Sequence, residues 1–258
     1  MNREEILKKV TEKKEFSQLP KKDLLLVFEN LNKPDYTDEE IVKKMREVLR
    51  KIYTSFLSEK LLNLKDKDFL WFLKKHKSTK ERILYYHSLY KKILSGISGK
   101  VTIYDFGCGV NGFSFPEFSK LGYGLNYVGV EAVGQLVKLQ QKFFENSKKV
   151  KFFHESLFET ENLKKIIKGG SGKQIIFLFK VIDSLETLKR DYSKKFLEEF
   201  VPLVDKVVLS FATKSLGKGK RFFVERTWIK KFIYEKFKVL EEFELGGENY
   251  FVFSKKDL

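Results

Sequence analysis

The chain has 258 residues, of which 42% are hydrophobic and 33% charged, and its formal net charge is +16. No apolar run approaches the ~18 residues of a membrane-spanning helix, and Met1 to Val10 lack the apolar core of a secretion signal. The single Cys108 cannot form an internal disulfide, and no Cys/His spacing indicates a metal site. These features predict a soluble cytoplasmic protein with a packed core in one or two domains.

The positive charge indicates a polyanionic partner, with nucleic acid the first choice and a membrane surface the second. It is unevenly spread, because residues 51–100 hold 12 Lys/Arg against 4 Asp/Glu and residues 211–237 hold 8 against 2, whereas residues 1–50 are nearly balanced. A single basic run is ordinarily a solvated face. Two separate basic regions favour a nucleic-acid partner.

Residues 1–75 read as an accessory helical domain, in which Pro20 and Pro34 separate short helices. A further short helix is expected over Asp66 to Lys75. One helix presents an apolar face on one side and basic residues on the other. That apolar face comprises Ile41, Met45, Val48, Leu49, Ile52, Phe56 and Leu57.

The stretch 76–82 reads His-Lys-Ser-Thr-Lys-Glu-Arg. Ser78 and Glu81 have the spacing of a capping box, which predicts a helix from here to about Leu94. A helix start offers free N–H groups, and Arg82 adds a cation. This combination suits an anion such as a carboxylate.

The stretch 101–111 predicts a buried strand that ends in a glycine-rich turn, with Asp105 at the end of the strand. Gly107 and Gly109 on either side of Cys108 let the backbone turn tightly and approach a ligand; Cys108 itself can equally be a small buried residue. A second strand ends at Glu131, where a carboxylate can accept hydrogen bonds from both hydroxyls of a ribose. The turn and this acid together predict a nucleoside-containing cofactor.

From residue 101 onward, strands alternate with helices, which predicts an α/β fold with a mainly parallel seven-stranded sheet. Gly246-Gly247-Glu248 separates the last two strands, so a C-terminal hairpin with an antiparallel edge strand is expected. The expected strands are Val101–Phe106, Tyr127–Glu131, Val150–His154, Gln174–Phe179, Lys206–Phe211, Val239–Leu245 and Asn249–Ser254. The expected helices include Ala132–Asn146, Asn162–Lys168 and Thr227–Phe237.

Four blocks in this order resemble the small-subunit ribosomal RNA guanine-N7 methyltransferases of the aminoglycoside-resistance (Arm/Rmt/Fmr) type. They are residues 76–82, Asp-Phe-Gly-Cys-Gly-Val-Asn at 105–111, Phe-Leu-Phe-Lys-Val-Ile-Asp-Ser-Leu-Glu at 177–186, and Ser-Phe-Ala-Thr-Lys-Ser-Leu-Gly-Lys-Gly-Lys at 210–220. The resemblance covers about residues 70 to 258. It implies a helical RNA-docking domain (1–75) followed by a Rossmann-like class I methyltransferase domain (76–258) that binds S-adenosyl-L-methionine (SAM).

The resemblance also implies roles for single residues. Arg82 would hold the methionine carboxylate, Glu131 the ribose, and the segment 155–157 the adenine, while Lys180 would lie beside the methyl donor or serve as a strand-end ion-pair partner. The implied cofactor residues are His76, Ser78, Thr79, Arg82, Asp105, Gly107, Cys108, Gly109, Glu131, Glu155, Ser156, Leu157 and Lys180.

RNA contacts are expected in the stretch after the fifth strand. The resemblance places Thr213, Lys214 and Ser215 at the mouth for the target nucleotide. Lys218, Lys220 and Arg221 among glycines form a cationic loop that suits phosphate contacts. The sequence departs from the family where Gly112 replaces proline, where the loop after Leu216 is shorter, and where Asp183 replaces an apolar residue or proline.

The expected reaction needs no catalytic acid or base, because guanine N7 carries a free lone pair and the sulfonium already activates the methyl group. Alignment would supply most of the catalysis, up to ~7–11 kcal/mol. The expected partner is the small ribosomal subunit, bound by a monomer without metal. The alternatives are a methyltransferase for another RNA base or a small molecule, and a non-catalytic RNA-binding module. A nicotinamide dehydrogenase is weaker, because the turn lacks the full Gly-x-Gly-x-x-Gly spacing.

Overall fold

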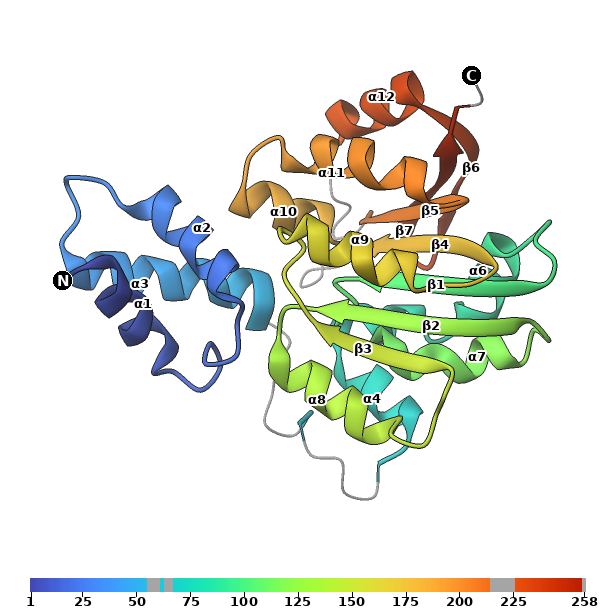
Figure 1. The fold of residues 1–258 in the computed structure, drawn as a ribbon, viewed down its shortest axis with the longest axis horizontal. Helices are drawn as coiled ribbons and strands as arrows, with labels where there is room; N and C mark the ends of the chain where they lie inside the picture. Colours follow the sequence, from blue (N-terminus) through green and yellow to red (C-terminus); the bar gives the residue numbers. More distant parts are fainter. Residues whose placement is uncertain (55–60, 63–66, 214–225, 257–258) are drawn as a thin grey trace.

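The chain begins with a group of short helices that pack on one another. The computed structural model describes residues 1–54, 61–62, 67–213 and 226–256. The helices α1 (Arg3–Thr11), α2 (Lys21–Leu31) and α3 (Asp38–Leu49) lie together at the N-terminal end of the molecule, at the left of Figure 1, and α3 continues into a π-helical turn, η1 (Arg50–Thr54). The predicted apolar face of the third helix is confirmed within the described residues, since Ile41, Met45 and Leu49 are buried.

Three further short helices precede the sheet: α4 (Phe69–Lys75), α5 (Lys77–Arg82) and α6 (Tyr86–Ile93). Helix α4 packs on the helical turn η2 (Asn111–Ser114), because the Phe72 ring stacks on Phe113 with centroids 4.2 Å apart. The single helix predicted from Ser78 to about Leu94 is wrong, since the helical hydrogen bonding is broken between α5 and α6.

A seven-stranded sheet forms the centre of the molecule, in the order β3-β2-β1-β4-β5-β7-β6. The five strands β3, β2, β1, β4 and β5 run parallel to one another. Strand β7 runs antiparallel to its two neighbours, β5 and β6. The strands are β1 (Lys100–Phe106), β2 (Gly124–Glu131), β3 (Val150–His154), β4 (Lys173–Phe179), β5 (Lys206–Ala212), β6 (Phe237–Leu245) and β7 (Glu248–Lys255). This confirms the predicted fold class and the seven predicted strands.

The predicted position of the antiparallel strand is wrong, because β7 lies inside the sheet and β6 forms the edge. Burial explains the order. Strand β6 alternates between more and less buried residues, as a strand with one solvated face does, whereas Tyr250 to Phe253 in β7 are buried on both faces. The hairpin therefore places its more apolar strand beside β5.

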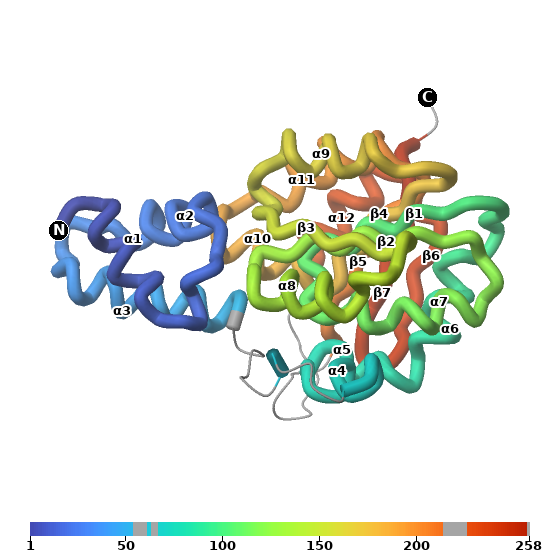
Figure 2. Tube along the Cα trace, turned by 60° about the horizontal axis from the view of Figure 1, so that its bottom comes forward, coloured from blue at the N-terminus to red at the C-terminus, as the bar shows by residue number. Residues whose placement is uncertain are grey.

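Helices cover both faces of the sheet, with α9 and α11 on one face and α7 and α8 on the other (Figure 2). No helix in the described ranges is long and apolar enough to cross a bilayer. The remaining helical elements are η2 (Asn111–Ser114), α7 (Phe115–Ser119), α8 (Gly134–Phe143), α9 (Thr160–Lys168), α10 (Ile182–Leu188), α11 (Tyr192–Phe200), η3 (Val201–Leu203) and α12 (Thr227–Lys236).

The strand order creates a crevice at one edge of the sheet. After β1 the chain builds β2 and β3 on one side and then crosses to build β4 on the other, and ligands of open α/β sheets bind at the carboxyl ends of strands where the order reverses. The N-terminal helices attach beside this crevice. The Gly134 N–H donates to the Gln18 carbonyl (3.2 Å), and the Asn30 side-chain amide donates to the Leu188 carbonyl (2.7 Å).

Candidate cofactor-binding site

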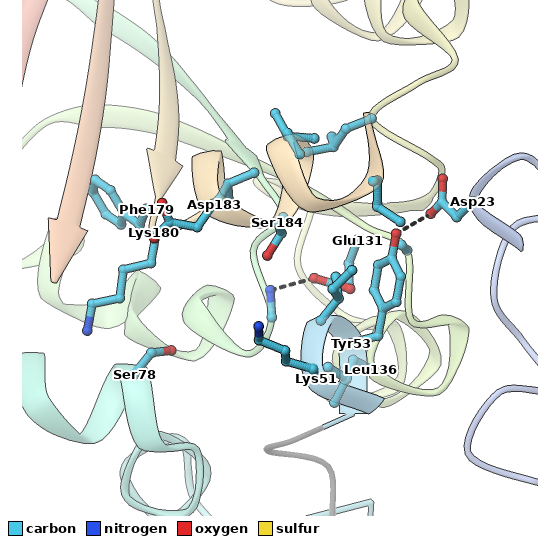
Figure 3. Close-up of a pocket in the computed structure, with 18 of the residues that line it drawn as sticks. Asp23, Lys51, Tyr53, Ser78, Glu131, Leu136, Phe179, Lys180, Asp183 and Ser184 are labelled. Carbon is cyan, nitrogen blue, oxygen red and sulfur yellow. Dashed lines mark hydrogen bonds between the residues drawn. The ribbon is translucent and has the colours of Figure 1, made fainter. Parts of the chain in front are cut away.

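A cavity of about 450 Å³ opens at the carboxyl edge of the sheet, and it is lined by the turn after β1, by residues of β2, β4 and β5, and by the N-terminal helices. Figure 3 shows Glu131 in the middle, Lys180 and Ser78 toward one end, and Asp23 and Tyr53 toward the other. Of the predicted cofactor residues, seven line the cavity: His76, Ser78, Gly107, Gly109, Glu131, Leu157 and Lys180.

The predicted glycine turn follows β1 directly. Gly107 has a φ of +71°, and a Cβ there would lie 2.8 Å from Val181 Cγ2, so only glycine fits without strain. The N–H groups of Gly107 and Cys108 both donate to the Val130 carbonyl, at 2.8 and 3.1 Å, which holds the turn against β2. The Cys108 side chain is buried, and burial raises the pKa of its thiol, so it stays protonated.

Asp105 lies behind the turn and does not line the cavity. Its carboxylate accepts hydrogen bonds from the Tyr127 hydroxyl (2.5 Å) and the Asn111 amide (2.7 Å), and Asn111 in turn accepts from the Tyr86 hydroxyl (2.7 Å). Burial raises the pKa of Asp105, although both donors oppose the shift. The geometry gives Asp105 the task of holding the turn that follows it.

Glu131 ends β2 with its carboxylate in the cavity. It accepts the Gly109 N–H at 2.7 Å and the Val133 N–H at 2.9 Å, which fixes its orientation. Burial raises the pKa of this carboxyl, and the backbone N–H donors oppose that shift. An oriented carboxylate with remaining acceptor positions can bind the two hydroxyls of a ribose.

The 76–82 stretch reaches the cavity through His76 and Ser78. The predicted capping box is wrong, because His76 is the N-cap of α5, no side chain caps the helix, and the Ser78 hydroxyl lies 3.0 Å from His76 Nδ1. Burial, with the nearby Arg82 and Lys180 cations, lowers the pKa of His76 to about 4, so its ring is neutral at pH 7. Thr79 is buried behind them and donates its hydroxyl to the Leu73 carbonyl (2.8 Å).

Arg82 does not line the cavity. It is buried and forms an ion pair with Glu248, which was not among the predicted site residues. Its guanidinium donates to both carboxylate oxygens of Glu248, at 2.7 and 3.2 Å, and stacks over the Phe179 ring, which itself lines the cavity. Burial alone would raise the pKa of Glu248, but Arg82 and Lys180 lower it overall.

Lys180, unlike Arg82, is among the cations that line the cavity. Its amine lies 2.8 Å from a Glu81 oxygen and 3.1 Å from a Glu248 oxygen, so it is also the ion-pair partner that the sequence left open. Lys180 has a φ of +59°, a left-handed backbone that costs a non-glycine residue about 1–2 kcal/mol. Such strain commonly occurs at functional sites.

The segment 155–157 divides between the cavity and the surface. Leu157 lines the cavity, whereas the Glu155 carboxylate turns away and accepts from the Asn162 amide (2.9 Å) and the Ser156 N–H (3.0 Å). The Ser156 hydroxyl is buried and donates to Asp23 of α2. Asp23 and Tyr53, both from the N-terminal helices, line the same end of the cavity and have no counterpart among the predicted site residues.

Asp183, one of the departures from the family, forms a two-pronged ion pair with Arg226 (2.9 and 2.6 Å). Both residues line the cavity, so this pair forms part of its wall. Thr213 lies apart from the cavity and bonds to the β6–β7 hairpin through its N–H and hydroxyl. The other predicted RNA-binding residues, Lys214, Ser215, Lys218, Lys220 and Arg221, fall outside the described residues.

Gly112, which replaces the family's proline, is explained by close packing. A Cβ there would lie 2.6 Å from the Phe152 ring and from Gln140 Oε1. We therefore expect Gly112→Ala to lower the free energy of unfolding by about 1–3 kcal/mol through overpacking, measured by urea denaturation.

Phe152→Leu in the same chain should recover part of that loss, because it removes the ring that the new methyl group meets. Gly124→Ala is the matched control. Its Cβ would meet nothing closer than Lys100 Cγ at 4.0 Å, so its effect should stay within about 0.5 kcal/mol. Equal losses for the two glycine variants would contradict the packing explanation.

Known proteins resemble this chain in sequence and in fold, although no protein-family model matches it. The 16S rRNA (guanine(1405)-N(7))-methyltransferase of Proteus mirabilis is 26% identical over 219 residues, which cover 83% of this chain and 75% of that protein. The solved 16S rRNA methylase RmtB superposes with a TM-score of 0.79 at 18% identity, over 99% of both chains.

The 16S rRNA methyltransferase RmtF, solved with S-adenosyl-L-homocysteine, superposes with a TM-score of 0.77 at 18% identity, over 99% of this chain and all of that one. This chain thus shares the Rossmann-like class I methyltransferase fold with RmtB and RmtF. The predicted resemblance is confirmed: this chain is similar to the 16S rRNA guanine-N7 methyltransferases of the aminoglycoside-resistance type.

Proposed function

We propose that this chain is a SAM-dependent methyltransferase that transfers a methyl group to guanine N7 of small-subunit ribosomal RNA near the decoding site. The observation that carries the proposal is the cavity at the carboxyl edge, where the Glu131 carboxylate lies between a polar end and an apolar end. SAM consists of an amino acid, a ribose and a purine in a row. The amino acid needs polar groups, the ribose hydroxyls need a hydrogen-bond acceptor, and the purine ring needs an apolar surface, which is the order found along this cavity.

In this assignment Glu131 binds the ribose hydroxyls, and Leu157 packs on the adenine. The methionine part lies along Gly107 and Gly109, and its carboxylate meets Lys180, Ser78 and neutral His76. Arg82 supports this end from behind through Glu248, which it shares with Lys180. SAM supplies an activated methyl group, and the chain's residues orient it toward the open side of the cavity.

No general base is required, since N7 of neutral guanine has no proton to lose. The residues therefore act by holding donor and acceptor in line. A base within structured RNA must leave its stack to reach the cavity, which costs a few kcal/mol.

We further propose that RNA contacts come from basic residues of the helical domain (1–75) and from Thr213, Lys214, Ser215, Lys218, Lys220 and Arg221. Lysines and arginines supply phosphate contacts that weaken as salt rises. On this proposal residues 1–75 act as the docking domain, and the protein works as a monomer in the cytoplasm, where it gives aminoglycoside resistance.

The test uses isotopically labelled SAM and purified small ribosomal subunits, followed by mass spectrometry of the digested RNA. We expect label in one decoding-region guanine as N7-methylguanine. The position corresponding to guanine 1405, for which the Proteus mirabilis relative is named, is the first to examine.

Two reactions are the controls: one without subunits should give no label, and one with Glu131→Ala protein should give much less label than the parent at the same SAM concentration. Label on another base would support SAM-dependent methyl transfer but show that the target base is not the one proposed. If no label appears and calorimetry detects no SAM binding, the methyltransferase proposal is refuted, and a non-catalytic RNA-binding module becomes the better explanation.

A further inference from the structure

The apolar end of the cavity is closed by residues from the N-terminal helices. Ile52 and Tyr53 of η1 line the cavity together with the apolar residues Ala132, Leu136, Leu157, Phe158 and Leu188. Aliphatic and aromatic walls of this kind suit the faces of a purine ring but cannot distinguish one purine from another. Discrimination needs a polar group that faces the ring edge, and Asp23 of α2 is the carboxylate present at this end (Figure 3).

Asp23 is only 1% exposed, and its partners hold it in one orientation. One carboxylate oxygen accepts from the Ser156 hydroxyl, and the other accepts from the Tyr53 hydroxyl at 2.9 Å. A carboxylate has about four acceptor positions. Two remain after these bonds, so Asp23 can accept a further donor from a molecule in the cavity.

Holding this carboxylate ionised has a cost. Burial, together with the charges of Glu155 and Glu159, raises the pKa of Asp23 to about 6, although the Ser156 and Tyr53 hydroxyls oppose the shift. Because the folded-state pKa lies above the ordinary value of 3.8, ionising Asp23 lowers the stability of the fold as the pH rises from about 3.8, and the loss is complete above about pH 6. A buried carboxylate that lowers the stability of the fold is more readily explained by a role in ligand binding than by a role in core packing.

We infer that Asp23 accepts a hydrogen bond from the exocyclic amine of the cofactor's adenine, so that the helical region selects adenine over other purines. This rests on the proposed function. Tyr53 orients Asp23 from η1 and lines the same end of the cavity. The cofactor thereby contacts both the sheet and the N-terminal helices.

The test measures two ligands by calorimetry at pH 7.5: S-adenosylhomocysteine and its deaminated analogue S-inosylhomocysteine, which carries an oxygen in place of the amine. The parent should prefer the adenosyl ligand by about 10- to 100-fold, because the oxygen would face a carboxylate. Asp23→Asn should lose most of this preference, because its amide can donate to the oxygen.

Glu159→Gln is the matched control, since it removes a neighbouring charge outside the cavity, and it should keep the preference. Asp23→Asn should melt at or above the parent's temperature at pH 7.5, because the buried charge is gone. Should that variant fail to fold, Tyr53→Phe keeps the ring, removes the hydroxyl that orients Asp23, and should reduce the preference in part.

The inference is overturned, with the proposed function intact, if Asp23→Asn weakens both ligands equally or if Glu155→Gln abolishes the preference instead. A parent protein that binds neither ligand would overturn the proposed function together with this inference.

Discussion

Replacing Glu248 with alanine should lower the free energy of unfolding by about 3–5 kcal/mol, because it leaves the buried Arg82 guanidinium without its ion-pair partner. The side chains of Arg82 and Glu248 are only 4% and 1% exposed, and Glu248 also accepts from Lys180 and the Ser210 hydroxyl. Removing it isolates Arg82 in the interior. Urea denaturation at pH 7 measures the loss.

Glu241→Ala is the control for this prediction, since Glu241 lies in the same hairpin but pairs with Lys92 at the surface. Its loss should be about 0–1 kcal/mol. The pH dependence gives a second check. The folded-state pKa of Glu248 is lowered, so its contribution is present above the ordinary value of 4.5 and disappears as the pH falls through the folded-state value. The gap between the parent and Glu248→Gln should close on acidification, and a gap that persists at low pH would count against the ion-pair explanation.

Glu131→Ala should weaken SAM binding by about 100-fold or more, the second large effect. On the proposed assignment, the variant loses two hydrogen bonds from the ribose to a charged acceptor, each worth about 1.5–3 kcal/mol. It also leaves the N–H groups of Gly109 and Val133 without their acceptor, which loosens the turn beside the methionine. Calorimetric titration with SAM measures the change.

Glu131→Gln should be intermediate, because its amide oxygen can still accept from one backbone N–H. Glu117→Ala removes a carboxylate of α7 that pairs with Lys120, and it should leave SAM affinity unchanged. A Glu131→Ala protein that binds SAM like the parent would mean that the ribose lies elsewhere.

Local sequence patterns were sufficient to predict the strands and part of the cofactor-binding site. The strands are short apolar runs or, in β6, an alternation of apolar and polar residues, so the identity of each depends on a few neighbours in the chain. Topology rules then place the ends of β1 and β2 together, which is why Gly107, Gly109 and Glu131 could be assigned to one crevice before their distances were known.

Contacts between distant segments could not be foreseen in this way. Nothing near Glu248 in the sequence indicates that it faces Arg82, 166 residues earlier, and it reads as part of a solvent-exposed turn. Asp23 meets Ser156 across 133 residues and reads as an ordinary acid in the first turn of a helix. Likewise the Ser78–Glu81 spacing favours a cap, but Ser78 instead contacts His76 at the cavity.

The sequence by itself thus determined the α/β sheet, its hairpin, the glycine turn and the acid at the end of β2, because these follow from local propensity and from the handedness of chain connections. Only the tertiary structure decided which charges are buried together, that Lys180 rather than Arg82 lines the cavity, and that the N-terminal helices complete the apolar end. The reason is that ion pairing and burial depend on which segments the fold brings into contact. A buried charge needs a partner because its desolvation is costly, and only the folded chain determines which residue that partner is.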